Sequence, residues 1–194
     1  MQNLFSLYVP KHFGKNSLLP DVLKDFLRKS ASTQFELTIS PGYLGEGEAF
    51  IRQAYDIFAG HVSHLTIYRG MTSLNRFNIT SRDLQCSLCV LVQQMRTKND
   101  HRKMMFFRNA NNTEAILIGS SNFSAKTYFG KDKGEADLLL FYDNSACEYY
   151  RKMINEGGED NTYSSCVLSE SIAMRDEPQQ YLDSIYHEFI SNAV

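Results

Sequence analysis

The sequence lacks the features that would place the protein in or across a membrane. No apolar run approaches the ~20 residues that a membrane-spanning helix needs. The start of the chain, MQNLFSLYVPKHFGK, has no basic segment followed by an unbroken apolar core, so it does not resemble a secretory signal peptide. Cysteine is also scarce, and Cys86, Cys89, Cys147 and Cys166 are too few and too scattered for a disulfide framework. These absences predict a cytoplasmic protein.

The pair Cys86-x-x-Cys89 has the spacing of a redox motif or of half a zinc site. A second pair is missing, however, and the surrounding segment LQCSLCVLV carries apolar residues at helical intervals. We therefore interpret these thiols as buried and structural.

The sequence also lacks a large net charge. Its 20 Lys and Arg against 22 Asp and Glu give −2, which predicts no overall attraction to nucleic acid. The distribution is uneven, because residues 96–133 hold eight basic against three acidic residues, whereas 155–194 hold one Arg against eight acidic residues. A phosphate-binding face with an acidic opposite end would give this pattern, and so would an ordinary solvated surface.

Length and composition are those of a globular domain. With 194 residues, 43% hydrophobic and 22% charged, we expect a single domain over residues 1–194 with a substantial core. Apolar periodicity predicts an α/β sandwich, a mixed sheet of about five to seven strands with helices on both faces. The strand–helix–strand order in residues 35–68 predicts parallel pairing. The expected helices are 21–29, 46–59, 81–95, 144–155 and 178–192, and the expected strands are 35–39, 65–68, 104–107, 115–118, 137–142 and 165–168.

Polar residues suited to phosphate chemistry flank three consecutive strands. His101 and Lys103 lead into the first, and residues two apart on a strand point to the same face. The second ends in Gly119-Ser120-Ser121-Asn122, and Glu135 precedes the third. A neutral imidazole can attack phosphorus, an ammonium, an amide and a hydroxyl can hold phosphate oxygens, and a carboxylate can fix the imidazole tautomer. Each piece alone has an ordinary structural interpretation, but together they predict phosphodiester cleavage without a metal.

These residues resemble the HxK, GSxN and E signature of the phospholipase D superfamily. Within it the likeness is to the small nucleases, particularly the catalytic domain of the NgoFVII-type restriction endonucleases, which cut without a metal. The sequence departs from the pattern at Arg108, which stands where the superfamily usually has an Asp five residues after the Lys. The separations between the motif pieces are also long, which an extended hairpin turn would absorb.

The resemblance implies a phospholipase D-like fold and a metal-independent DNA endonuclease with no cofactor. His101 would form a phosphohistidine, Lys103, Ser120 and Asn122 would complete the site, and Glu135 would hydrogen-bond the imidazole. Because the chain has one HxK and in-line chemistry needs a second His, the resemblance implies a symmetric homodimer with one shared site. Weaker candidates for contacts with DNA phosphates are Arg102, Lys126, Lys131 and Lys133.

Two other functions stay open. A phospholipase D-like lipid or other phosphodiester hydrolase would be favoured by an apolar rim or an amphipathic membrane helix. A non-catalytic domain that binds nucleic acid or tethers a partner would be favoured if Glu135 faced away from His101. The NgoFVII-type enzymes carry a separate sequence-reading domain, and residues 156–194, a loop, a short strand and a closing helix, are too few to form it. The chain is therefore either the N-terminal part of a longer protein or a nuclease whose specificity comes from elsewhere.

Overall fold

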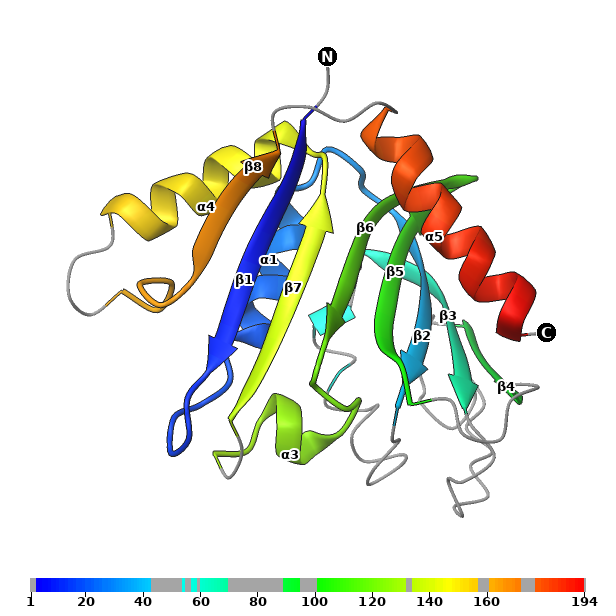
Figure 1. Ribbon diagram of the computed structural model, residues 1–194, viewed down its shortest axis with the longest axis horizontal. Coiled ribbons are helices and arrows are strands. Elements are labelled where there is room, and N and C mark those ends of the chain that lie inside the picture. Colours follow the sequence, from blue (N-terminus) through cyan, green and yellow to red (C-terminus); the bar gives the residue numbers. More distant parts are fainter. Residues whose placement is uncertain are drawn as a thin grey trace.

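One mixed sheet of eight strands, with helices on both faces, forms the frame of the computed structural model (Figure 1). The structure describes residues 3–42, 54, 57–58, 60–69, 89–94, 101–131, 134–156, 161–171 and 177–193. The strands are β1 (Leu4–Lys11), β2 (Phe35–Pro41), β3 (Val62–Arg69), β4 (Cys89–Gln94), β5 (Lys103–Asn109), β6 (Asn112–Gly119), β7 (Glu135–Phe141) and β8 (Val167–Ser171). The helices are α1 (Leu19–Lys29), α3 (Ala125–Tyr128), α4 (Asn144–Glu156) and α5 (Pro178–Ala193). The predicted α/β sandwich is confirmed, with more strands than expected.

The strand order β4-β3-β2-β5-β6-β7-β1-β8 combines a parallel and an antiparallel part. β2, β3 and β4 run parallel to one another, which confirms the predicted pairing of the first two, and the remaining neighbours are antiparallel. The predicted β5–β6 hairpin is present, but the expectation of an extended turn is wrong. Its turn is only Ala110 and Asn111, because both strands are longer than predicted and absorb the extra residues.

The predicted helix over residues 81–95 is wrong in the part that the structure describes. Cys89–Gln94 is instead strand β4, paired with β3 from His64 to Arg69. Leu91, which the helical pattern placed on the buried stripe, is 50% exposed. The consecutive apolar residues Cys89–Val92 also fit a short strand, and here pairing with β3 outweighed the helical pattern. The side chains of Cys86 and Cys89 lie outside the described residues, so the interpretation of these thiols stays a prediction.

Strand β1 was not predicted, although its sequence alternates. Phe5, Leu7 and Val9 are buried on one face, and the strand lies between β7 and β8. Pro10 interrupts the run in sequence, but it lies beyond Tyr8, the last residue paired with β8. A proline is tolerated at such a position because no ladder hydrogen bond is needed there on that side.

The two faces of the sheet carry separate cores. α1 and α4 cover one face, and α5 covers the other (Figure 1). The predicted stripe of α1 is buried through Val22, Leu23, Phe26 and Leu27. The apolar periodicity of residues 178–192 predicts that Tyr181, Leu182 and Phe189 are all buried. Helix α5 does bury Leu182 and Phe189, but Tyr181 is 38% exposed. The predicted helix over residues 46–59 lies mostly outside the described residues, within which Ala54, Ile57 and Phe58 are helical and buried.

No helix in the described part of the chain is long and apolar enough to cross a membrane.

Candidate active site

The sheet topology brings all five candidate catalytic residues to one end of the sheet. β5, β6 and β7 are consecutive antiparallel neighbours, so the start of β5, the end of β6 and the start of β7 lie together, beside α3 (Figure 1). His101 and Lys103 stand at the start of β5, Ser120 and Asn122 directly follow β6, and Glu135 opens β7.

The same end of the sheet gathers charged side chains on the face covered by α1 and α4. Lys103 precedes Met105 and Phe107, which belong to the core on that face, and side chains two apart share a face. In the paired strands Lys103 lies opposite Pro41, and Gly119 lies opposite Asp137. The candidate site therefore continues the core of that face at its solvent end.

Ser120 and Glu135 are joined directly. The Ser120 hydroxyl donates to Glu135 Oε2 at 2.5 Å and accepts from the Ala136 amide at 2.9 Å, while the Ser120 amide donates to the Ala136 carbonyl at 3.0 Å. These contacts fix the hydroxyl and hold the carboxylate at the sheet end.

The expected hydrogen bond between Glu135 and the His101 imidazole is not formed in the structure. Among the described residues no hydrogen bond joins the two, and the Glu135 carboxylate is bound by Ser120 instead. The reason is topological: β6 lies between β5 and β7, so the residues that follow β6 are nearer to Glu135 than the residues that precede β5.

Lys103 and Asn122 meet above Gly42. Gly42 has φ +63°, and a Cβ there would lie 2.7 Å from Lys103 Cγ, 3.0 Å from Lys103 Nζ and 3.1 Å from Asn122 Oδ1. The Lys103 ammonium also donates to the His101 carbonyl at 2.9 Å. The sequence identified Pro41-Gly42 only as the end of a strand, but the missing side chain of Gly42 is what lets the motif lysine and asparagine lie side by side.

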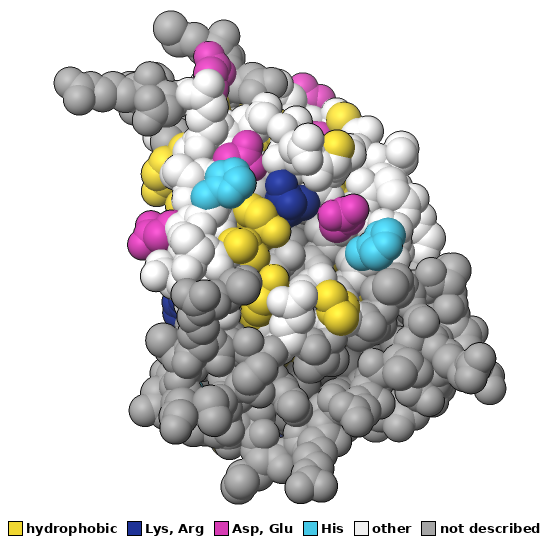
Figure 2. Space-filling view, turned by 90° about the vertical axis from the view of Figure 1, so that its right-hand side faces the viewer, with side chains coloured by type: hydrophobic (Ala, Val, Ile, Leu, Met, Phe, Trp, Pro, Cys, Tyr) yellow, Lys and Arg dark blue, Asp and Glu magenta, His cyan; other side chains and the backbone are white. Residues whose placement is uncertain are grey.

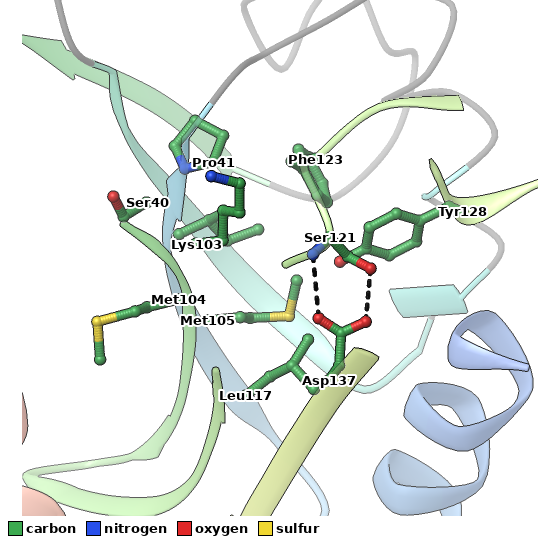
Figure 3. Close-up of a pocket in the computed structure, with 11 residues that line it drawn as sticks. Ser40, Pro41, Lys103, Met104, Met105, Leu117, Ser121, Phe123, Tyr128 and Asp137 are labelled. Carbon is green, nitrogen blue, oxygen red and sulfur yellow. Dashed lines mark hydrogen bonds between the residues drawn. The ribbon is translucent and has the colours of Figure 1, made fainter. Parts of the chain in front are cut away.

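A second carboxylate, on Asp137, was missed by the sequence analysis. It is buried, and it accepts from the Ser121 amide at 3.2 Å on Oδ1 and from the Ser121 hydroxyl at 2.5 Å on Oδ2 (Figure 3). Burial, and secondly the nearby Glu135 charge, raise the pKa of Asp137 to about 6, against the opposing effects of the Ser121 hydrogen bonds and Lys11. A signal was present in the sequence, because Asp137 follows Glu135 by two residues on a strand and so shares its face.

Lys11 is a further missed residue. It is buried at the end of β1, opposite Glu135, and its ammonium donates to the carbonyls of Lys126 at 3.2 Å and Thr127 at 2.9 Å. These carbonyls belong to α3, so Lys11 anchors that helix over the sheet end. No local pattern singles out Lys11, because its partners come from distant parts of the chain.

A small internal space lies between Lys103 and Asp137. Its volume of about 10 Å³ is no more than a single water molecule needs, and Met105, Leu117, Phe123 and Tyr128 help to line it (Figure 3). Asp137 and Ser121 are buried, whereas His101 and Ser120 are exposed. A substrate would therefore reach the outer side of the turn that contains Ser120, not its inner side.

Among the weaker phosphate-binding candidates, Arg102 is directed away from the site. Arg102 places its guanidinium 4.8 Å from the ring centre of Phe189 on α5, the opposite face of the sheet. Lys126 and Lys131 are exposed near α3, and Lys133 lies outside the described residues. On the described surface of the side drawn in Figure 2, Lys and Arg stand singly among acidic and apolar side chains.

Arg108, the departure from the family pattern, lies away from the site. Its guanidinium stands 4.1 Å from the ring centre of Tyr186 on α5 and donates to the Asn111 carbonyl at 2.8 Å. It is near the end of β5 that lies away from the candidate site.

Metal ligands do not cluster in the described part of the chain, where no group of three His, Cys, Asp or Glu side chains could hold an ion.

Comparison with known proteins gives structural likenesses only. No family profile and no curated protein matches the sequence. The structure is similar to Nuc from Salmonella typhimurium, a phospholipase D family member, with 14% identity and TM-score 0.45 over 76% of this chain and 90% of Nuc. NucT from Helicobacter pylori is 19% identical with TM-score 0.39, over 76% of this chain and 96% of NucT. The yeast tyrosyl-DNA phosphodiesterase is 16% identical with TM-score 0.42, over 69% of this chain, which spans only 32% of that enzyme. Identities below 20% say nothing about the chemistry of this chain.

Proposed function

We propose that the protein is a phospholipase D-like phosphodiester hydrolase that cuts DNA without a metal through a phosphohistidine. The observation that carries the proposal is the meeting of His101, Lys103, Ser120, Asn122 and Glu135 at one end of the sheet. They come from three neighbouring strands, and the nucleophile candidate His101 is exposed. Each of these residues alone has an ordinary structural interpretation, and it is their proximity that supports the proposed function.

In the proposed first step an imidazole nitrogen of His101 attacks phosphorus. The N–P bond forms while the P–O bond to the leaving oxygen breaks, and an acid on the far side protonates that oxygen. Lys103 supplies a positive charge, and the Asn122 amide a donor, to the non-bridging oxygens. Water then attacks the phosphohistidine, gives its proton to the group that acted as the acid, and releases the phosphate product.

Glu135 acts through Ser120 in this proposal. Its carboxylate holds the Ser120 hydroxyl, whose second hydrogen bond comes from the Ala136 amide. The hydroxyl is thus oriented before substrate binds, and a preorganised group loses less entropy on binding than a free one.

The acid on the far side is proposed to be the His101 of a second copy. The chain offers one HxK, and a symmetric dimer would place two His101 side chains across one phosphodiester. The exposure of His101 at the end of the sheet leaves it accessible to a partner.

Cleavage of supercoiled plasmid in excess EDTA tests the function. We expect the wild-type protein to nick and linearise the plasmid and the His101→Ala variant to leave it intact, with an unchanged melting temperature because the side chain is exposed. Cleavage that persists in the folded variant would remove His101 from the mechanism. Cleavage that needs a divalent metal would contradict the metal-independent mechanism.

The restriction-endonuclease role is the finer proposal. It rests on the likeness of the motif residues to the NgoFVII-type enzymes. End-labelled DNA of known sequence distinguishes the outcomes, because cutting at fixed positions supports sequence recognition, whereas a uniform ladder indicates a nuclease that takes its specificity from another domain or protein.

A further inference from the structure

The turn that follows β6 presents three consecutive side chains in different directions. Ser120 is exposed and bound to Glu135, Ser121 is buried and bound to Asp137, and Asn122 is half-buried beside Lys103 and Gly42. The two flanking residues belong to the proposed site, whereas the middle one points into the protein. Whatever fixes Ser121 therefore fixes the directions of its two neighbours.

Asp137 is the group that fixes Ser121. Each carboxylate oxygen accepts one hydrogen bond from Ser121, Oδ1 from the amide at 3.2 Å and Oδ2 from the hydroxyl at 2.5 Å. Hydrogen bonds to both the backbone and the side chain of Ser121 restrict its rotation, and charge-assisted bonds of this kind are stronger than neutral ones. Figure 3 shows the pair of bonds closing a ring between the turn and β7.

Gly119 makes this contact sterically feasible. A Cβ on Gly119 would lie 1.9 Å from Asp137 Oδ1 and 2.6 Å from the Ala136 carbonyl oxygen. A side chain at this position would clash with Asp137. The absence of a side chain on Gly119 therefore leaves room for the Asp137 carboxylate. The half-buried Gly119 and the buried Ser121 and Asp137 together support Ser120 and Asn122 from the inner side of the turn.

From this arrangement we infer that Asp137 is a positioning residue of the proposed active site, which holds Ser120 and Asn122 in their working directions by fixing Ser121. It does not touch the substrate, because it is buried on the inner side of the turn. The inference rests on the proposed function for its effect on catalysis, and on geometry alone for its effect on the turn.

The charged form of Asp137 is disfavoured in the folded protein, mainly by burial. The groups that face it are Glu135 on its own strand, Lys11 from β1, Tyr128 from α3, and Lys103 from β5 across the small internal space. Burial raises the pKa of Asp137 to about 6 in the folded state, from an ordinary value of 3.8. Because the folded state then holds the proton more tightly, the stability given by protonated Asp137 is present below pH ~4 and is lost as pH rises through about 6.

The test compares Asp137→Ala with Asp143→Ala in the full chain. Asp143 is a matched control, because it is also buried and accepts backbone amides, from Ala31 at 2.7 Å and Ala146 at 2.9 Å, and the Ser30 hydroxyl, but just beyond the opposite end of β7. With a fluorophore-labelled DNA duplex we expect Asp137→Ala to lower kcat about 10- to 100-fold, as small misplacements of reacting groups do. Asp143→Ala should keep kcat even where its melting temperature falls more.

Rescue distinguishes positioning from loss of packing. Asp137→Asn keeps an oxygen for the Ser121 amide, so it should recover much of the lost kcat. Its melting temperature should exceed the wild-type value at pH 7.5 and approach it at pH 4, because the amide carries no buried charge. Should Asp137→Ala not fold, Ser121→Ala removes one of the two hydrogen bonds and should lower kcat in the same direction, with Ser30→Ala as its control.

A second measurement decides the inference without catalysis. The side-chain amide resonances of Asn122 in NMR spectra should move in Asp137→Ala, or in Ser121→Ala, and stay in place in Asp143→Ala. Unmoved Asn122 resonances, or an equal loss of kcat in both Ala variants, would overturn the positioning role. If the wild-type protein cuts no DNA, the proposed function fails, and the Asn122 resonances still give the answer for Asp137.

Discussion

Two glycines at the end of the sheet leave room for side chains of the proposed site. Gly119 leaves the space that the Asp137 carboxylate occupies, and Gly42 leaves the space in which Lys103 and Asn122 meet. Both spaces are filled by residues distant in sequence, so each glycine is explained only by what lies against it.

Gly42→Ala should have two effects: backbone strain that lowers stability, and steric displacement of Lys103 that lowers kcat. The positive φ of Gly42 makes any side chain cost about 1–2 kcal/mol of stability. The added methyl would also displace Lys103, for which we expect a further loss of about 10- to 100-fold in kcat. Gly60→Ala is the control, because Gly60 has φ +80° with no atom within 4 Å of its Cβ position. Equal kcat in the two variants, measured with the labelled duplex, would show that Lys103 tolerates the methyl.

Arg108→Asp tests whether the departure from the family pattern matters. The change removes the contact with the Tyr186 ring, worth about 0.5–2 kcal/mol, and supplies the acid that the superfamily usually has. Because the position lies at the far end of β5, we expect a lower denaturation midpoint and an unchanged kcat. A rise in kcat would mean that the acid acts on the site from a distance.

At the scale of elements, one helix packs under the strands that carry the candidate site, toward the ends opposite to it. Phe26 of α1 is fully buried against Phe35, Phe107 and Phe141, with ring centres 5.4–6.0 Å apart. These rings belong to β2, β5 and β7, whose ends hold the site residues. The rings lie toward the ends opposite to the site, since Phe35 opens β2 and Phe141 ends β7. This packing therefore holds the three strands together away from the site residues.

Phe26→Ala should destabilise the fold by about 3–5 kcal/mol, as for other buried aromatic rings cut to a methyl. Phe13→Ala should change stability by less than about 0.5 kcal/mol, because Phe13 is 79% exposed. Urea denaturation followed by circular dichroism gives both values. A small effect at Phe26 would mean that the aromatic cluster can close over the cavity.

At the scale of the whole molecule, a site shared by two chains predicts a definite loss of activity when wild-type and variant chains are mixed. If both copies of His101 are needed at one phosphodiester, a dimer of one wild-type and one His101→Ala chain is inactive. Equal mixing after subunit exchange should then leave about a quarter of the activity of the same total amount of wild type. A loss of only one half, or a monomer in analytical ultracentrifugation, would mean that each chain works alone.

The sequence by itself determined the elements whose pattern is local. The buried stripe of α1, the β5–β6 hairpin, β7, α4 and α5 follow from periodicity and turn residues, and the order of His101, Lys103, Ser120, Asn122 and Glu135 along the chain is likewise written in the sequence. Local patterns failed at β4, where pairing with β3 outweighed a helical spacing, and at β1, whose alternation is interrupted by Pro10.

Only the tertiary structure decided which of these residues touch. Glu135 binds Ser120 and not His101, because β6 lies between β5 and β7. Asp137, Lys11 and Gly42 join the site through strand pairing and through residues far away in the chain. Such contacts depend on the order of strands in the sheet, which is set by the burial of whole faces and not by any short stretch of sequence.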